Sequence, residues 1–144
     1  MKITFPYEEK KSDIFPKIKR PIAEVYFWSK LINGWLGYKM IVDTGADYTV
    51  LPKYRAVDLG VNLKKDCEIK KTFGVGGGVT VYFLKNKAKM KIGQLELNIP
   101  LGFLDADNVP PLLGREGCLN VFRLIFAGFQ TKFIFNLRQL KSVE

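Results

Sequence analysis

The sequence predicts an all-β fold, a small barrel or sandwich of short strands. Short runs rich in branched and aromatic residues recur along the chain, and glycine, proline and Asn-Gly turn signals separate them. The length of 144 residues suits one domain, and a composition of 47% hydrophobic and 26% charged residues is typical of folded globular proteins. The sequence has no internal repeat that would indicate a different architecture.

The elements follow in order from the N-terminus. Residues 1–21 carry three prolines and mixed charges without a sustained period, so we expect an N-terminal arm or edge strand there and a single domain over residues 22–144. Strands are expected where branched or aromatic residues run together, at residues 22–28, 36–42, 48–51, 68–73, 79–84, 88–92, 95–103, 122–126 and 132–137.

Local signals also predict the connections. Asn33-Gly34 favours a hairpin turn between the first two strands of the domain. Residues 52–59 predict one or two helical turns that end at Gly60, and a short helix is expected near residues 116–122. The fold is therefore expected to be all-β with little helix.

The chain has no histidine and two cysteines, Cys67 and Cys118. The missing imidazole excludes Ser-His-Asp and Cys-His catalysis and every zinc site that depends on histidine. Two cysteines are too few for a disulfide framework or a four-thiolate metal site, and each is expected to be a small buried residue. Catalysis by this chain would therefore use carboxylates, lysine, hydroxyl groups or a hard metal ion.

A net charge of +9 is also found in proteins that bind nucleic acid, because Lys and Arg neutralise phosphates. Lys85, Lys87, Lys89 and Lys91 alternate with other residues, which predicts that all four lie on one face of a strand. Such a row more often marks a solvated or edge strand than a phosphate-binding stripe. Nucleic-acid binding is therefore the less favoured interpretation of the charge.

No apolar run approaches the ~20 residues that a membrane-spanning helix requires. Residues 1–21 also lack the apolar core of a signal peptide. The sequence therefore predicts a soluble, cytoplasmic protein with no membrane segment in this chain.

Residues 74–78 form a glycine-rich segment, Gly-Val-Gly-Gly-Gly. A nucleotide-phosphate loop would be followed by a helix, but a strand is expected from Val79 onward. The segment from Phe73 to Val79 is therefore expected to be the tip of a hairpin, either a simple flexible turn or a mobile flap.

The most informative motif begins where an apolar strand, residues 40–42, leads into Asp43, Thr44 and Gly45. An aspartate at the end of a strand is by itself usually a turn former. However, the string D-T-G-A-D-Y-T-V-L-P, the glycine-rich hairpin and the later element Leu-Leu-Gly-Arg together resemble the retropepsin-like aspartic proteases. The resemblance extends over roughly residues 22–137 in order and approximate spacing, and it implies a small, closed, barrel-like acid-protease fold.

The resemblance also implies a role for each residue of these motifs. Asp43 would be the catalytic carboxylate, Thr44 would hydrogen-bond to its counterpart across a dimer axis, and Gly45 would let substrate backbone approach closely. Asp47 would accept a salt bridge from Arg115 at the floor of the site. Further support would come from Ala46, Leu112, Leu113 and Gly114, and the flap from Phe73, Gly74, Val75, Gly76, Gly77, Gly78 and Val79.

Peptide hydrolysis by carboxylates needs one group that accepts a proton from water and one that donates a proton to the carbonyl oxygen. The chain contains a single Asp-Thr-Gly, so a homodimer would have to bring two Asp43 carboxylates together. This reading implies an aspartic endopeptidase that acts on a peptide or protein substrate without metal or cofactor. The alternatives are a retropepsin-like dimeric interaction or regulatory domain with little turnover, and a basic β-barrel that binds nucleic acid.

Overall fold

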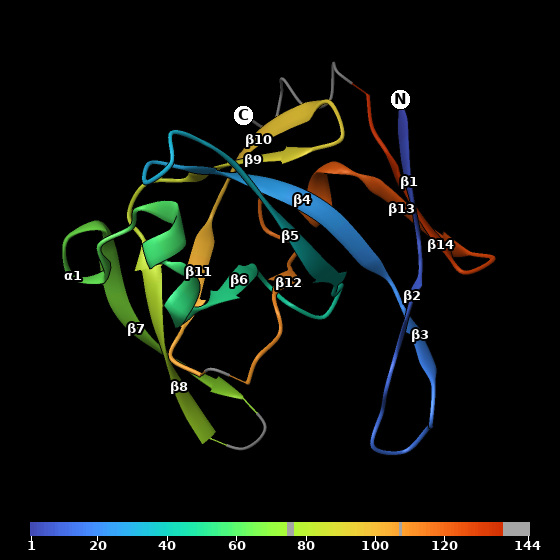
Figure 1. The fold of residues 1–144 in the computed structure, drawn as a ribbon, viewed down its shortest axis with the longest axis horizontal. Coiled ribbons are helices and arrows are strands. Elements are labelled where there is room, and N and C mark those ends of the chain that lie inside the picture. Colours follow the sequence, from blue (N-terminus) through green and yellow to red (C-terminus); the bar gives the residue numbers. More distant parts are fainter. Residues whose placement is uncertain (75–76, 107, 137–144) are drawn as a thin grey trace.

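The computed structural model describes residues 1–74, 77–106 and 108–136, and over these ranges its frame is a nine-stranded sheet (Figure 1). The strands of this sheet are β4 (Ile22–Ser29), β5 (Gly34–Val42), β6 (Thr49–Pro52), β7 (Cys67–Gly74), β8 (Gly77–Leu84), β9 (Ala88–Ile92), β10 (Leu95–Ile99), β11 (Leu101–Leu104) and β12 (Leu112–Leu113). Their order is β10-β9-β4-β5-β12-β6-β11-β8-β7. The all-β prediction is confirmed, although the sheet has β10 and β7 at its edges and does not close into a barrel.

The N- and C-terminal parts of the described chain meet in a second sheet. Its strands are β1 (Lys2–Pro6), β14 (Gln130–Ile134) and β13 (Arg123–Ala127), in the order β1-β14-β13. β2 (Glu8–Lys10) pairs with β3 (Ile18–Arg20) as a separate ribbon, which Figure 1 shows at the lower right, away from the main sheet. Residues 1–21 therefore hold three strands, and β1 lies at an edge.

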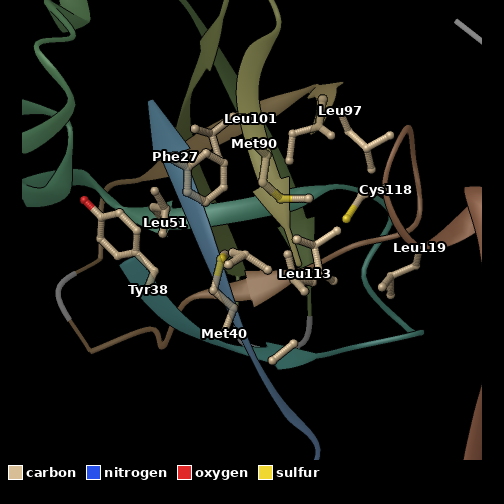
Figure 2. Packing of buried hydrophobic residues seen from close by; sticks show 14 of the residues in the cluster. Phe27, Tyr38, Met40, Leu51, Met90, Leu97, Leu101, Leu113, Cys118 and Leu119 are labelled. Carbon is tan, nitrogen blue, oxygen red and sulfur yellow. The ribbon is translucent and has the colours of Figure 1, made fainter. Parts of the chain in front are cut away.

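Alternating burial explains why the longest strands form. In β4, Val25 and Phe27 are 0% and 1% exposed, whereas Glu24 and Tyr26 face outward. The neighbouring strands add their own inward-facing side chains to one core. Figure 2 shows the packing of several of these residues, among them Phe27, Met40, Leu51, Met90, Leu101 and Leu113.

The expected strand over residues 95–103 is divided in the structure, and its second half has different partners. β10 pairs with β9, whereas β11 runs parallel to β6 and antiparallel to β8. Pro100 separates the two strands because proline cannot donate a backbone hydrogen bond to a ladder. The chain therefore changes position in the sheet at this residue.

The expected row of four lysines is also only partly correct. Lys85 and Lys87 precede β9, so only Lys89 and Lys91 lie on the strand. β9 pairs with β10 on one side and with β4 on the other, so it is not an edge strand. Its lysines face outward because Met90 and Ile92 occupy the buried face.

Short helical turns connect several strands. η1 (Lys53–Arg55) and η2 (Val57–Leu59) confirm the helical turns expected over residues 52–59, and the left-handed conformation of Gly60 ends them at a φ of 71°. η3 (Leu119–Val121) is the short helix expected near residues 116–122. All three are 3-10 helices of three residues.

One further helix, α1 (Leu63–Asp66), was not expected from the sequence. The side chain of Asn62 begins it by accepting hydrogen bonds from the amides of Lys64 and Lys65, each at 3.1 Å. Over the described ranges, the helices are all too short or too polar to cross a membrane.

Candidate active site

The candidate site forms where β12 lies between β5 and β6. Leu113 of β12 pairs in parallel with Val42 of β5, and Leu112 pairs in antiparallel fashion with Val50 of β6. The segment 43–48 joins β5 to β6 and must therefore pass around the end of β12. Its position in the sheet depends on a strand that comes some seventy residues later in the sequence.

Asp43 begins this connection in a tight turn. Its amide donates to the Leu113 carbonyl oxygen at 3.1 Å, and its own carbonyl accepts from the Ala46 amide at 3.1 Å. The Gly45 amide donates to Oδ1 of Asp43 at 2.9 Å, so a backbone N–H holds the carboxylate in place. Asp43 is half-buried, whereas Thr44 and Gly45 are exposed.

Gly114 follows Leu113 and packs against the end of the connection between β5 and β6, at Tyr48 and Thr49. Its amide donates to Oγ1 of Thr49 at 3.1 Å, and both groups are buried. A β-carbon at position 114 would overlap the backbone carbonyl of Tyr48, so only glycine fits at this close approach. The segment after β12 and the connection between β5 and β6 are therefore packed backbone to backbone.

Two residues missed by the sequence analysis complete this floor. Thr49 is 0% exposed and supplies the oxygen that Gly114 requires. The thiol of Cys118 also hydrogen-bonds to Thr49; burial raises the pKa of this thiol to about 12, and the hydrogen bond acts in the opposite direction. A threonine within an otherwise apolar run is the signal that could have identified the position.

Arg115 and Asp47 form the ion pair that the resemblance implied. Arg115 Nη2 lies 2.6 Å from Oδ1 of Asp47. Backbone hydrogen bonds accompany the pair, from the Arg115 amide to the Ala46 carbonyl at 3.0 Å and from the Glu116 amide to the Asp47 carbonyl at 2.8 Å. The Arg115 and Asp47 side chains are 48% and 74% exposed, so the pair lies at the surface of the chain.

The expected flap is a hairpin of β7 and β8. Phe73 pairs with Gly78 and Gly74 with Gly77, and the φ of 114° at Gly77 is a conformation that favours glycine. Phe73 is 81% exposed. Val75 and Gly76 lie outside the described residues, and Val79 follows on β8.

The structure thus brings Leu113, Gly114 and Arg115 against the segment from Asp43 to Asp47, while the flap residues lie on a separate hairpin. In the described part of the chain, no group of three or more Cys, Asp or Glu residues is placed to hold a metal ion. The polar groups gathered at this place are the Asp43 carboxylate, the backbone amides around it and the Asp47–Arg115 pair.

The Asp-Thr-Gly turn lies in a connection that passes around the end of the short strand β12. This arrangement, in an all-β chain, is that of a retropepsin-like aspartic protease fold. The chain belongs to the gag-polyprotein putative aspartyl protease family, whose sequence model matches residues 29–116. The resemblance to retropepsin-like proteases is therefore confirmed.

A solved structure supports the same fold. The crystal structure of a retropepsin-like aspartic protease from Rickettsia conorii superposes with a TM-score of 0.63, and the alignment covers 92% of this chain and 98% of that chain. The sequence identity is 19%, so the likeness concerns the fold. No curated protein was found to match the chain.

Proposed function

We propose that the chain is an aspartic endopeptidase that works as a homodimer and uses Asp43 from each protomer. The observation that carries the proposal is the Asp43 turn, in which the backbone is bonded to Leu113 and the carboxylate accepts the Gly45 amide. A carboxylate fixed by backbone groups has a defined position for acid–base chemistry. Thr44 and Gly45 are exposed beside it, where a partner and a substrate would approach.

The need for two carboxylates argues for the dimer. Two carboxyl groups about 3 Å apart share one proton, as the aspartic proteases illustrate in general. Asp47 is a poor second member of such a pair because Arg115 already engages it at 2.6 Å. A twofold axis beside Asp43 would supply the second group, and Thr44 would hydrogen-bond to the partner's backbone or side chain across that axis.

The proposed reaction follows from the shared proton. The ionised carboxylate accepts a proton from water while the water oxygen attacks the carbonyl carbon of the peptide bond, and the protonated carboxyl donates its proton to the carbonyl oxygen. The tetrahedral intermediate then collapses, the C–N bond breaks, and the leaving nitrogen accepts a proton from the dyad. All bonds and protons of this reaction are accounted for without a metal or a cofactor.

The β7–β8 hairpin supplies a surface on which an extended peptide would lie. β7 is an edge strand of the main sheet, and a substrate strand would bond to free backbone groups in the manner of strand addition. Phe73 offers an exposed aromatic ring beside these groups. Closure of the hairpin over the peptide would exclude water from the two carboxylates.

The test is a peptide-library cleavage assay across pH with the wild type, Asp43→Asn and Asp13→Asn. Asp13 is exposed in the β2–β3 connection, so its variant is a matched control that removes the same charge. We expect Asp43→Asn to abolish cleavage and to keep the fold and the dimer, because an amide cannot accept and return the proton. Full activity of purified Asp43→Asn would exclude the proposed mechanism.

The dimer has its own test. Specific activity should fall when the protein is diluted below the dimer dissociation constant, and excess Asp43→Asn chains should inhibit the wild type through mixed dimers. A monomer in sedimentation that keeps full specific activity would contradict this part of the proposal.

A further inference from the structure

The loop between β4 and β5 holds two aliphatic side chains in solvent. Leu31 is 64% exposed and Ile32 is 54% exposed. Figure 1 shows this loop in light blue at the upper left edge of the molecule, beyond the ends of both strands. Exposed apolar surface marks an interaction site where it is contiguous and bordered by polar residues, so the neighbours of these two side chains decide its meaning.

The loop is held firmly in this exposed position. The Lys30 amide donates to the Leu59 carbonyl at 3.2 Å, and the Ile32 amide donates to Oγ of Ser29 at 3.4 Å. The hydroxyl of Ser29 in turn donates to the Asp58 carbonyl at 2.5 Å. These bonds tie the loop to η2, so Leu31 and Ile32 present their apolar surface without rearrangement.

Tryptophan and lysine side chains lie on the two strands that this loop joins and on the neighbouring strand β9. Trp28 and Trp35 form a cross-strand pair next to it, with ring centroids 5.5 Å apart. The ammonium of Lys89 lies 5.1 Å from the Trp28 ring centroid and 5.3 Å from that of Trp35, and the ammonium of Lys91 lies 4.7 Å from the Trp35 centroid. Glu96 lies 4.0 Å from Lys89, so Lys89, Lys91 and Glu96 together carry one net positive charge.

A cavity of about 170 Å³ opens beside Trp28. Its lining includes apolar side chains such as Phe27 and Leu101. The charged side chains of the lining are three lysines, Lys30, Lys87 and Lys89, and one carboxylate, Asp66. The cavity therefore combines an apolar lining with groups that attract anions. We define the hairpin-end patch as Trp28, Lys30, Leu31, Ile32, Trp35, Lys87, Lys89 and Lys91.

We propose that the hairpin-end patch docks on the surface of an anionic lipid bilayer. Leu31 and Ile32 enter the boundary between headgroups and acyl chains, and the two tryptophans lie at the level of the headgroups, where their amphipathic rings are favoured. The lysines of the patch attract the negative charge of phosphate and carboxylate headgroups. Docking of this kind is peripheral, because the patch would enter only the interface of the bilayer.

The contacts favour a membrane over a single-stranded nucleic acid as the partner. Bases stack on open aromatic faces, but Lys89 and Lys91 already lie over the tryptophan rings. Exposed aliphatic side chains contribute little to nucleic-acid binding, whereas they contribute directly to insertion in a bilayer interface. Only the membrane interpretation therefore uses the charge and the apolar tip together.

The patch also lies far from Asp43. Gly34 and Asp43 stand at opposite ends of β5, a strand of nine residues that spans about 30 Å at the usual rise. A protein docked through the hairpin end therefore keeps the Asp43 turn away from the bilayer. This inference does not depend on the proposed protease activity.

Both tryptophans of the chain are in the patch, so intrinsic fluorescence reports directly on docking. We expect a blue shift and co-sedimentation with vesicles of phosphatidylcholine containing phosphatidylserine, and neither with pure phosphatidylcholine vesicles. High salt should weaken the binding. Asp43→Asn should bind like the wild type.

Substitutions in the hairpin-end patch test which residues contact the bilayer. The double variant Leu31→Asp/Ile32→Asp should lower the partition coefficient of the protein between vesicles and water at least tenfold. The double variant Lys89→Gln/Lys91→Gln should lower this coefficient roughly fivefold for each lysine. Ile14→Asp is the matched control, because Ile14 is 83% exposed in the β2–β3 connection and has lysines but no tryptophan nearby in sequence. Leu31→Ala/Ile32→Ala gives a milder second test if the charged variant unfolds.

Three results would overturn the proposal. The first is the absence of vesicle binding at low salt for the wild type. The second is a loss of binding in Ile14→Asp as large as that in Leu31→Asp/Ile32→Asp. The third is quenching of the tryptophans by a single-stranded oligonucleotide without any response to anionic vesicles, which would assign the patch to nucleic acid.

Discussion

The amide of Gly114 donates a hydrogen bond to Oγ1 of Thr49 across 3.1 Å in the interior of the protein. The bond joins the segment after β12 to the first residue of β6, and so connects two parts of the chain that are distant in sequence. Asp43 lies on the other side of the same junction, bonded to Leu113. The position of the candidate catalytic group therefore depends on a buried bond in which that group takes no part.

Replacement of Thr49 by valine tests this bond. Thr49→Val keeps the side-chain volume but leaves the Gly114 N–H buried without an acceptor, which lowers the free energy of unfolding by about 1–3 kcal/mol. Thr49→Ser keeps the oxygen and is the matched control. Urea unfolding curves of the two variants give the comparison, and equal stability would show that the hydrogen bond contributes nothing.

Gly114→Ala should be more harmful than a typical glycine substitution. The added β-carbon overlaps the Tyr48 carbonyl, so either the backbone shifts or the chain fails to fold. Gly34→Ala is the control, since its β-carbon would meet Ile32 at an ordinary 3.7 Å. We expect soluble expression and the thermal midpoint to fall for the first variant and to stay near wild type for the second.

Arg115→Met should have a small effect on the stability of an isolated protomer. The pair with Asp47 is short, but both side chains are about half exposed or more, and exposed pairs contribute about 0–1 kcal/mol. A larger loss, of about 3–5 kcal/mol, is expected only if dimer formation buries the pair. Thermal unfolding at low and high protein concentration separates the two cases, because burial in the dimer makes the loss concentration-dependent.

Binding of a peptide mimic should change the β7–β8 hairpin. A hydroxyl-bearing transition-state mimic is expected to slow hydrogen exchange at the amides of residues 77–80, because an extended ligand bonds to the flap and the flap closes over it. Replacement of Gly77 and Gly78 together by valine should lower turnover, and it should also strain the hairpin tip because Gly77 has a φ of 114°. Equal exchange with and without a saturating ligand would argue against a flap.

The buried thiol of Cys118 should make stability depend on alkaline pH. Its pKa is raised from 9.0 to about 12 by burial, so the folded protein holds the proton that the unfolded chain releases above pH 9. This contribution to stability is present below pH 9 and is lost as the pH rises towards 12. Urea midpoints at pH 8 and pH 10.5 should therefore fall further apart in the wild type than in Cys118→Ala.

The sequence predicted much of the fold because most strands carry local signals. The alternating side chains of β4 and the turn at Asn33 needed no knowledge of distant residues, and neither did the end of η2 at Gly60. The same reasoning failed at Pro100, where the choice of partner for β11 depends on β6 and β8. Local patterns indicate a strand, but tertiary packing selects its neighbours.

The residues of the candidate site also divide into those that the sequence predicted and those that it did not. The Asp-Thr-Gly motif and its resemblance to known proteases predicted Asp43, and they also predicted the pair of Asp47 with Arg115. The role of Thr49 was not predicted, because a single threonine gives no sign of the amide that will reach it from position 114. The exposure of the Asp47–Arg115 pair likewise depends on packing that the motif does not encode.

The position of β12 also affects when the site forms during protein synthesis. Asp43 is made seventy residues before Leu113, the residue that bonds to its amide. At about 5–20 residues per second, the ribosome adds Leu113 roughly 4–14 s after Asp43. During that time the nascent chain lacks the strand around which the Asp43 turn is built. Until Leu113 has been added, the polypeptide therefore lacks a finished Asp43 turn. If the chain is the proposed protease, this delay would protect it and its neighbours from premature cleavage.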